Sequence, residues 1–109
     1  MDKNTIREIS VQELNRLLLA PERFQLIDVR EKDEYEAANL GGKLIPSGQI
    51  LTRQVEIDDT LPTAVLCRSG KRSATAILQL QQLGFENLYN VKGGILAFAK
   101  EIDNNLRPI

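Results

Sequence analysis

Residues 64–73 have the sequence Ala64-Val65-Leu66-Cys67-Arg68-Ser69-Gly70-Lys71-Arg72-Ser73. The stretch opens with a short apolar run of the kind that is buried in the middle of a parallel sheet. It then passes through a polar loop into residues 72–83, where apolar side chains recur at helical spacing. A buried strand that leads through a loop into an amphipathic helix is the repeating unit of α/β domains, so this stretch predicts that fold class.

The same alternation of strands and helices continues on both sides of this stretch. Further strands are expected at 24–29, 43–45 and 88–91, and further helices at 11–18, through 35–38, weakly at 50–55, and at 95–102. Gly84 follows the central helix where a left-handed residue commonly ends one. Such an alternation favours a mainly parallel sheet, in which sites form at the C-terminal ends of the strands.

The composition is that of an ordinary globular domain. The 109 residues fit a single domain over 1–109, with 42% hydrophobic and 27% charged residues. No segment approaches the ~20 apolar residues that cross a bilayer, and no signal peptide is evident, so a cytoplasmic location is expected. The net charge of -1 argues against nucleic-acid and membrane-surface partners.

The complete lack of histidine narrows the chemistry further. It excludes Ser-His and Cys-His catalysis, and it removes the commonest metal ligand. We therefore expect no metal site. The single cysteine cannot form an internal disulfide, so the role of its thiol needs a separate explanation.

Cys67 lies where a thiol can be held as a thiolate. It ends the apolar run, and the helix that follows begins among the cations Arg68, Lys71 and Arg72, so the helix dipole and the positive charges both favour the anion. Gly70 allows the loop to curl with several N–H groups directed inward. Two alternatives remain open: a small buried hydrophobe, and a loop that binds phosphate through its backbone without a covalent step.

These residues resemble the rhodanese family, and the resemblance covers nearly the whole chain. It is carried by residues 26–31 with Glu34 and Tyr35, by Ile45-Pro46, by the loop 67–73, and by residues 90–95. The resemblance implies a rhodanese-like α/β fold, with a central, mainly parallel five-stranded sheet flanked by helices on both faces. It also implies a sulfurtransferase, in which a cysteine takes sulfane sulfur from a donor and passes it to a thiophilic acceptor.

The resemblance also implies roles for the residues of the loop. Cys67 would be the persulfide carrier, and the substrate would be bound by Arg68, Ser69, Gly70, Lys71, Arg72 and Ser73. The implied donors are thiosulfate or a protein persulfide, such as that of a cysteine desulfurase. No cofactor is implied.

The resemblance points to one subgroup of the family in two stretches, the C-terminal residues 98–108 and residues 38–42. They are similar to the rhodanese domain that is fused behind MoeB/ThiF-like adenylyltransferases, which implies a small sulfur-carrier protein of molybdopterin or thiamine synthesis as the acceptor. A free-standing domain fits the same residues. The chain departs from the common family pattern at 38–43 and at Phe98, which replaces a tryptophan, and these departures leave the donor preference open.

Two other functions compete with sulfur transfer. The spacing Cys-x4-Arg matches sulfurtransferases, whereas related dual-specificity phosphatases use Cys-x5-Arg. One further residue adds up to ~3.3–3.6 Å of chain, which would widen the loop for a tetrahedral phosphate. The other alternative is a non-catalytic rhodanese-fold binding or regulatory module, and the intact Cys67 and its basic loop argue against it.

Two charged stretches outside the loop are expected to contribute less to the site than the loop does. Asp28 and Arg30 are candidate supporting residues, because a carboxylate at the end of a neighbouring strand could orient a loop arginine. The simpler interpretation is a helix cap or a local, exposed ion pair worth only ~0–1 kcal/mol. Residues 31–36 are expected to form a solvated helical face.

Overall fold

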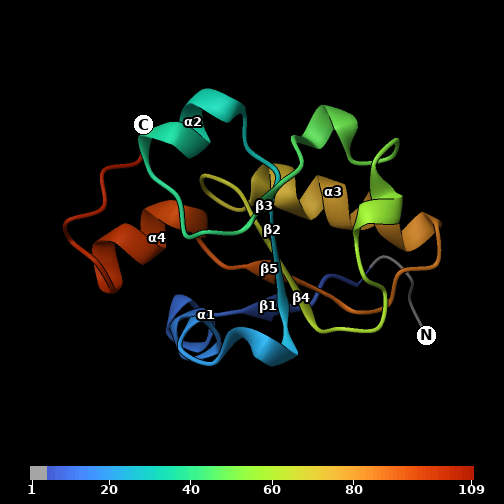
Figure 1. The fold of residues 1–109 in the computed structure, drawn as a ribbon, viewed down its shortest axis with the longest axis horizontal. Coiled ribbons are helices and arrows are strands. Elements are labelled where there is room, and N and C mark those ends of the chain that lie inside the picture. The colour runs from blue at the N-terminus through green and yellow to red at the C-terminus, as the bar shows by residue number, and fades with distance from the viewer. Residues whose placement is uncertain (1–4) are drawn as a thin grey trace.

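The computed structural model describes residues 5–109, and the centre of this part of the chain is a five-stranded parallel sheet. The strands lie in the order β1-β5-β4-β2-β3, and all the neighbouring pairs are parallel. Figure 1 shows β4 and β5 near the middle of the molecule. The expected α/β fold is therefore confirmed. The strands span Glu8–Ile9 (β1), Gln25–Asp28 (β2), Lys43–Leu44 (β3), Thr63–Leu66 (β4) and Leu88–Val91 (β5).

Among residues 5–109, α-helices follow four of the strands, and the last of these helices comes after the final strand. They span Val11–Leu18 (α1), Lys32–Ala37 (α2), Lys71–Gln82 (α3) and Gly94–Glu101 (α4). Ser10 caps α1 by accepting a hydrogen bond from the backbone N–H of Glu13, at 3.1 Å. Gly84 follows α3 with φ of +97°, the left-handed conformation expected of it.

The helix expected at 50–55 does not form. Turns replace it between two short 3₁₀ segments, η2 (Ser47–Gln49) and η3 (Gln54–Glu56). Ile50 is buried in the core, whereas Leu51 and Val55 are exposed, so no continuous apolar face supports a longer helix here. A further 3₁₀ segment, Pro21–Arg23, precedes β2.

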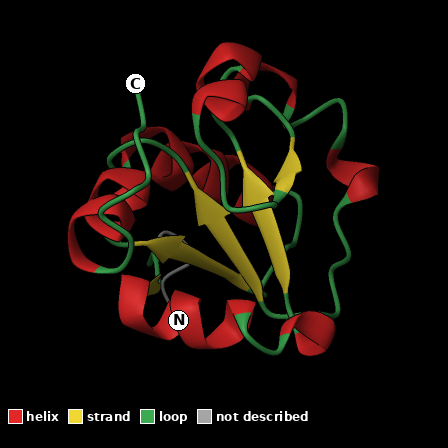
Figure 2. Cartoon of the chain, turned by 60° about the vertical axis from the view of Figure 1, so that its left-hand side comes forward, coloured by secondary structure: helices red, strands yellow, loops and turns green. Residues whose placement is uncertain are grey.

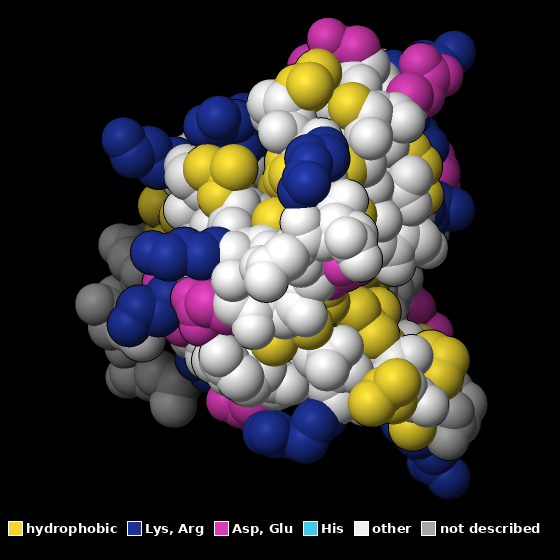
Figure 3. All heavy atoms as spheres, turned by 90° about the vertical axis from the view of Figure 1, so that its left-hand side faces the viewer, with side chains coloured by type: hydrophobic (Ala, Val, Ile, Leu, Met, Phe, Trp, Pro, Cys, Tyr) yellow, Lys and Arg dark blue, Asp and Glu magenta, His cyan; other side chains and the backbone are white. Residues whose placement is uncertain are grey.

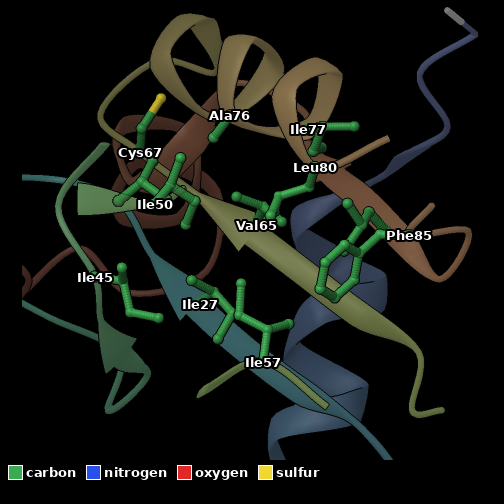
Figure 4. Close-up of a cluster of buried hydrophobic side chains, with 12 residues drawn as sticks. Ile27, Ile45, Ile50, Ile57, Val65, Cys67, Ala76, Ile77, Leu80 and Phe85 are labelled. Atoms are coloured by element: carbon green, nitrogen blue, oxygen red, sulfur yellow. The ribbon is translucent and has the colours of Figure 1, made fainter. Parts of the chain in front are cut away.

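Helices cover both faces of the sheet, which separates the core into two clusters (Figure 2). Side chains alternate along the strands, so Leu26 and Ala64 face α1 and α4, while Ile27 and Val65 face α3. Cys67 belongs to the cluster on the α3 face (Figure 4). The thiol is thus fixed by the same packing that holds α3 against the sheet.

Two kinds of feature are absent from residues 5–109. No helix in this range is long and apolar enough to cross a membrane. Within the same range, His, Cys, Asp and Glu side chains form no group of three or more that could hold a metal ion.

Candidate functional site

The loop after β4 positions Cys67 at the C-terminal edge of the sheet. Cys67 is 1% exposed, and its Sγ atom points toward the start of α3 (Figure 4). Gly70 ends the loop with φ of +103° and acts as the N-cap of α3. This left-handed conformation favours glycine, and it turns the backbone N–H of Gly70 back toward the sulfur. Strand, loop and helix together form a cradle around one sulfur atom.

Neutral hydrogen-bond donors surround the sulfur. The backbone N–H of Gly70 donates to Sγ at 3.0 Å, and the Ser73 hydroxyl lies 3.3 Å from Sγ. Burial alone would raise the pKa of the Cys67 thiol, but the Ser73 hydroxyl and the N–H groups of Ser73, Gly70 and Ser69 outweigh it and lower that pKa below its ordinary value of 9.0. Hydrogen bonds to the sulfur are therefore the main cause that favours the thiolate. The sequence pattern had instead indicated the positive charges of the loop as the cause.

Asn90 on β5 ties the two ends of this cradle together. Its Nδ2 donates to the carbonyl oxygen of Gly70 at 3.0 Å, and its Oδ1 accepts from the Ser73 hydroxyl at 2.5 Å. The residue is only 4% exposed. Sequence reasoning did not assign it a role, although a polar side chain in a buried strand beside the site is a signal that could have found it.

The N-terminus of α4 holds the loop from the other side. The N–H groups of Ile95 and Leu96 donate to the carbonyl oxygens of Cys67 (2.9 Å) and Arg68 (3.1 Å). A Cβ at Gly94 would lie 2.6 Å from the Cys67 oxygen and closer still to the Arg68 carbonyl. Because the loop carbonyls are bound by α4, the loop N–H groups are left to face the sulfur.

The cationic side chains of the loop lie outside this cradle. Arg68 and Lys71 are exposed, and Arg68 Nε donates to the Ile109 main-chain oxygen at 3.0 Å. Ser69 is also exposed, so its contribution to the sulfur comes from its backbone. Lysine and arginine side chains are scattered singly over the face that carries α2, α4 and the C-terminus (Figure 3). That face presents no broad basic patch.

Arg72 is held by a carboxylate of residues 31–36, the stretch that the sequence predicts to be a solvated face. Glu34 of α2 accepts two hydrogen bonds from Arg72, with Nη1–Oε1 at 2.7 Å and Nη2–Oε2 at 2.8 Å. Glu34 also accepts from the Glu31 N–H at 2.9 Å, within the capping box that begins α2. Its hydrogen bonds to Arg72 are the largest cause that lowers the pKa of Glu34 to about 2. The expectation of a solvated face is therefore wrong for Glu34.

Asp28 and Arg30 form a local ion pair, but its expected exposure is wrong. Both residues are fully buried, and Arg30 Nη2 lies 2.8 Å from Asp28 Oδ2. Arg30 also donates to the carbonyl oxygens of Glu34 (3.2 Å) and Ala38 (2.8 Å). These contacts direct the pair toward α2. It supports the loop only indirectly, through the helix that presents Glu34.

A cavity of about 310 Å³ opens beside the loop, between η2 and α3. Lys71 and Arg72 form its charged end. The rest of the lining is small or polar: Ser47, Gly48, Thr75, Ala76 and Gln79. This lining suits a polar group next to the loop better than a large apolar ligand.

Comparison with known proteins identifies the family. A model of the Rhodanese-like domain matches residues 10–101. Over 113 residues, 36% are identical to the Rhodanese-like/PpiC domain-containing protein 12, chloroplastic, of Arabidopsis thaliana, covering 96% of this chain and 38% of that protein. Identity is 33% to the Adenylyltransferase and sulfurtransferase UBA4 of Meyerozyma guilliermondii, covering 74% of this chain and 21% of that protein. The chain thus spans well under two thirds of these two relatives.

Two other matches extend over nearly the full length of this chain and of the matched protein. A Sulfurtransferase of Allochromatium vinosum is 32% identical, with 87% of this chain and 90% of that protein covered. The crystal structure of a Rhodanese-like domain protein from Staphylococcus aureus superposes with a TM-score of 0.80 at 28% identity, covering 95% of this chain and 99% of that one.

Proposed function

The chain belongs to the family of rhodanese-like domains, and we propose that it is a sulfurtransferase that carries sulfane sulfur as a persulfide on Cys67. The observation that carries the proposal is the set of hydrogen-bond donors around a sulfur atom whose pKa they lower. A thiolate is the nucleophilic form of cysteine. Donors fixed around the sulfur stabilise the thiolate before the reaction and an anionic persulfide after it.

The proposed reaction has two steps. The Cys67 thiolate attacks the sulfane sulfur of the donor, a new S–S bond forms, and the donor's own bond to that sulfur breaks. The leaving group keeps the electron pair and departs as sulfite from thiosulfate, or as a thiolate from a protein persulfide. A thiophilic acceptor then attacks the outer sulfur and releases Cys67 as the thiolate, so no external oxidant or reductant is required.

The proposed partners are an acceptor and a donor of sulfur. The similarity to proteins named adenylyltransferase and sulfurtransferase supports a small sulfur-carrier protein as the acceptor. A cysteine desulfurase that bears a persulfide is the proposed protein donor, and thiosulfate is the small-molecule alternative. We propose the cytoplasm as the location of this relay.

A non-catalytic binding module is the second candidate, favoured by the low exposure of Cys67. A thiol that is buried for packing alone is ordinarily a small hydrophobic group. It has no need of donors that favour its ionised form, and Cys67 has several. We therefore rank this candidate below the sulfurtransferase.

Intact-mass measurement tests the proposal. Wild type and Cys67→Ser are incubated with thiosulfate, or with a cysteine desulfurase and cysteine. Wild type is expected to gain one sulfur atom that cyanide or a reductant removes, and Cys67→Ser is expected to gain none. Failure of the wild type to gain sulfur from either donor would leave the binding module as the better proposal. Turnover of an aryl phosphate that depends on Cys67 would instead indicate a phosphatase.

A further inference from the structure

The ion pair between Glu34 and Arg72 is formed before any substrate arrives. Both oxygens of Glu34 are engaged by Arg72, and the capping box of α2 holds the carboxylate from its other side. The Glu34 side chain is 14% exposed and that of Arg72 is 36% exposed. A bidentate, charge-assisted pair is geometrically specific, so Glu34 holds the Arg72 guanidinium in one position.

Arg72 is also the loop cation that shares an electrostatic interaction with the reacting group. It precedes Ser73, whose hydroxyl lies 3.3 Å from the Cys67 sulfur, and it lines the cavity beside the loop. The charge of the Cys67 thiolate contributes to the raised pKa of Arg72, after the larger effect of its hydrogen bonds to Glu34. A donor that approaches Cys67 therefore meets the carboxylate of Glu34 together with the guanidinium.

The other two loop cations compensate for this carboxylate only weakly. Arg68 and Lys71 are exposed, where solvent and salt screen their charges. The positive charge of Arg72, the loop cation held against the protein, is thus largely cancelled by Glu34.

We propose that Glu34 is a specificity-determining residue, which biases the Cys67 site against the dianion thiosulfate and toward monoanionic donors such as a persulfide. This inference rests on the proposed sulfur transfer and specifies its donor class. Glu34 acts through Arg72 and is a positioning residue, because it touches neither the sulfur nor the donor.

Two small donors of similar chemistry separate charge from reactivity. Thiosulfate carries two negative charges, and the methanethiosulfonate anion carries one. In each case Cys67 attacks the sulfane sulfur, the bond from that sulfur to the oxidised sulfur breaks, and sulfite or methanesulfinate leaves with the electron pair. Both reactions yield the same Cys67 persulfide, so their ratio reports on donor charge.

Glu34→Gln is the central variant, because it removes the charge and keeps the shape of the side chain. Coulomb's law gives a dianion twice the response of a monoanion, so KM should fall about tenfold for thiosulfate and about threefold for methanethiosulfonate. The kcat values should change much less than KM. The matched control is Glu36→Gln, which removes the same charge from an exposed position on the same helix. It should leave the ratio of the two KM values unchanged.

The reverse variant makes the test independent of how well Glu34→Gln folds. Arg72→Gln leaves the Glu34 charge unpaired and should raise KM for thiosulfate more than for methanethiosulfonate. The double variant Glu34→Gln/Arg72→Gln should restore the wild-type ratio to within about twofold, since the two changes offset each other.

Equal responses of the two donors to Glu34→Gln or Arg72→Gln, or an equal shift of the ratio in Glu36→Gln, would overturn the inference. These outcomes are distinct from failure of the proposed function. If wild-type Cys67 never acquires sulfur from either donor, it is the proposed sulfur transfer that is wrong.

Discussion

At the scale of single residues, the Ser73 hydroxyl has more acceptors than it has hydrogens. It lies 2.5 Å from Asn90 Oδ1 and 3.3 Å from the Cys67 sulfur, and a hydroxyl can donate only one hydrogen bond at a time. While Cys67 is a thiol, its S–H can donate to Ser73 as Ser73 donates to Asn90. Once Cys67 is ionised, the hydroxyl gains by turning toward the sulfur. Ser73 therefore couples the ionisation of Cys67 to the hydrogen bond between Ser73 and Asn90.

We predict that Ser73→Ala raises the pKa of Cys67 by about one unit, since a hydrogen bond to a charged group contributes roughly 1.5–3 kcal/mol and backbone donors remain. The ultraviolet absorbance of the thiolate, followed against pH and corrected with Cys67→Ser, measures it. Ser69→Ala is the control, because its side chain is exposed and its contribution comes from the backbone N–H. Equal shifts in the two variants would contradict a role for the Ser73 hydroxyl.

Residue types in the sequence indicated the chemistry of the site. They did not indicate which groups the charged side chains would bind. The position of Cys67 after a strand and the turn at Gly70 followed from local pattern. The partner of Arg72 did not, because Glu34 is 38 residues away and only the tertiary fold brings them together. The burial of Arg30 could not be predicted from the sequence either, since an Asp-x-Arg pair has the same sequence whether it is exposed or buried.

At the scale of elements, α4 acts as a brace for the loop. Its first N–H groups bind the carbonyls of Cys67 and Arg68, and this approach is close enough to exclude any side chain at Gly94. Gly94 also has φ of +63°, which disfavours other residues. This role of Gly94 was not predicted from the sequence, because a contact across the sheet edge leaves no local signal.

We predict that Gly94→Ala lowers the free energy of unfolding by about 3 kcal/mol or more, combining overpacking with backbone strain. Gly84→Ala is the matched control: it also has positive φ, but a Cβ there meets nothing within 4 Å. It should cost about 1 kcal/mol. Urea denaturation of both variants gives the two values. A loss in Gly94→Ala no larger than in Gly84→Ala would show that α4 does not brace the loop.

The contact of α2 with α3 through Glu34 should make stability depend on acid. The pKa of Glu34 is lowered from 4.5 to about 2 in the folded protein, first of all by its hydrogen bonds to Arg72. A lowered folded-state pKa gives stability that is full above pH 4.5 and is lost as the pH falls toward about 2. The ion pair therefore contributes at neutral pH and not in strong acid.

We predict that Glu34→Gln is less stable than wild type by about 1 kcal/mol at neutral pH, a modest value because solvent screens part of the pair. The difference should shrink as the pH falls from 4.5 through about 2, because Glu34 of the wild type becomes protonated over this range. Chemical denaturation at a series of pH values measures the difference. Glu36→Gln should show little difference at any pH, and a constant deficit for Glu34→Gln would mean that packing, not charge, is lost.

At the scale of the whole molecule, one sheet separates two apolar clusters and presents the loop at its edge. The alternation of strands and helices predicted a mainly parallel sheet with a site at its C-terminal edge, whereas helices on both faces were implied by the resemblance to the rhodanese family. Two short features escaped prediction. The two-residue β1 is too short to show a pattern, and the 47–56 segment depends on Ile50 reaching the core from a run that is otherwise exposed.

Since both clusters pack against the same strands, the domain should unfold as one unit. Leu14 belongs to the cluster on the α1 and α4 face and Leu80 to the cluster on the α3 face, and both are fully buried. We predict that Leu14→Ala and Leu80→Ala each lower the free energy of unfolding by about 3 kcal/mol. Leu19→Ala, at a side chain that is 79% exposed, should change it by no more than about 0.5 kcal/mol.

The test of cooperativity is whether two probes agree in each variant. Backbone circular dichroism reports on all the helices, whereas tyrosine fluorescence reports on Tyr89 in β5 and Tyr35 in α2. Their urea transitions should coincide in wild type, Leu14→Ala and Leu80→Ala, because loss of either face exposes the strands that support the other. Separate transitions in Leu14→Ala would mean that the α3 face, with Cys67 and its loop, can stay folded without α1.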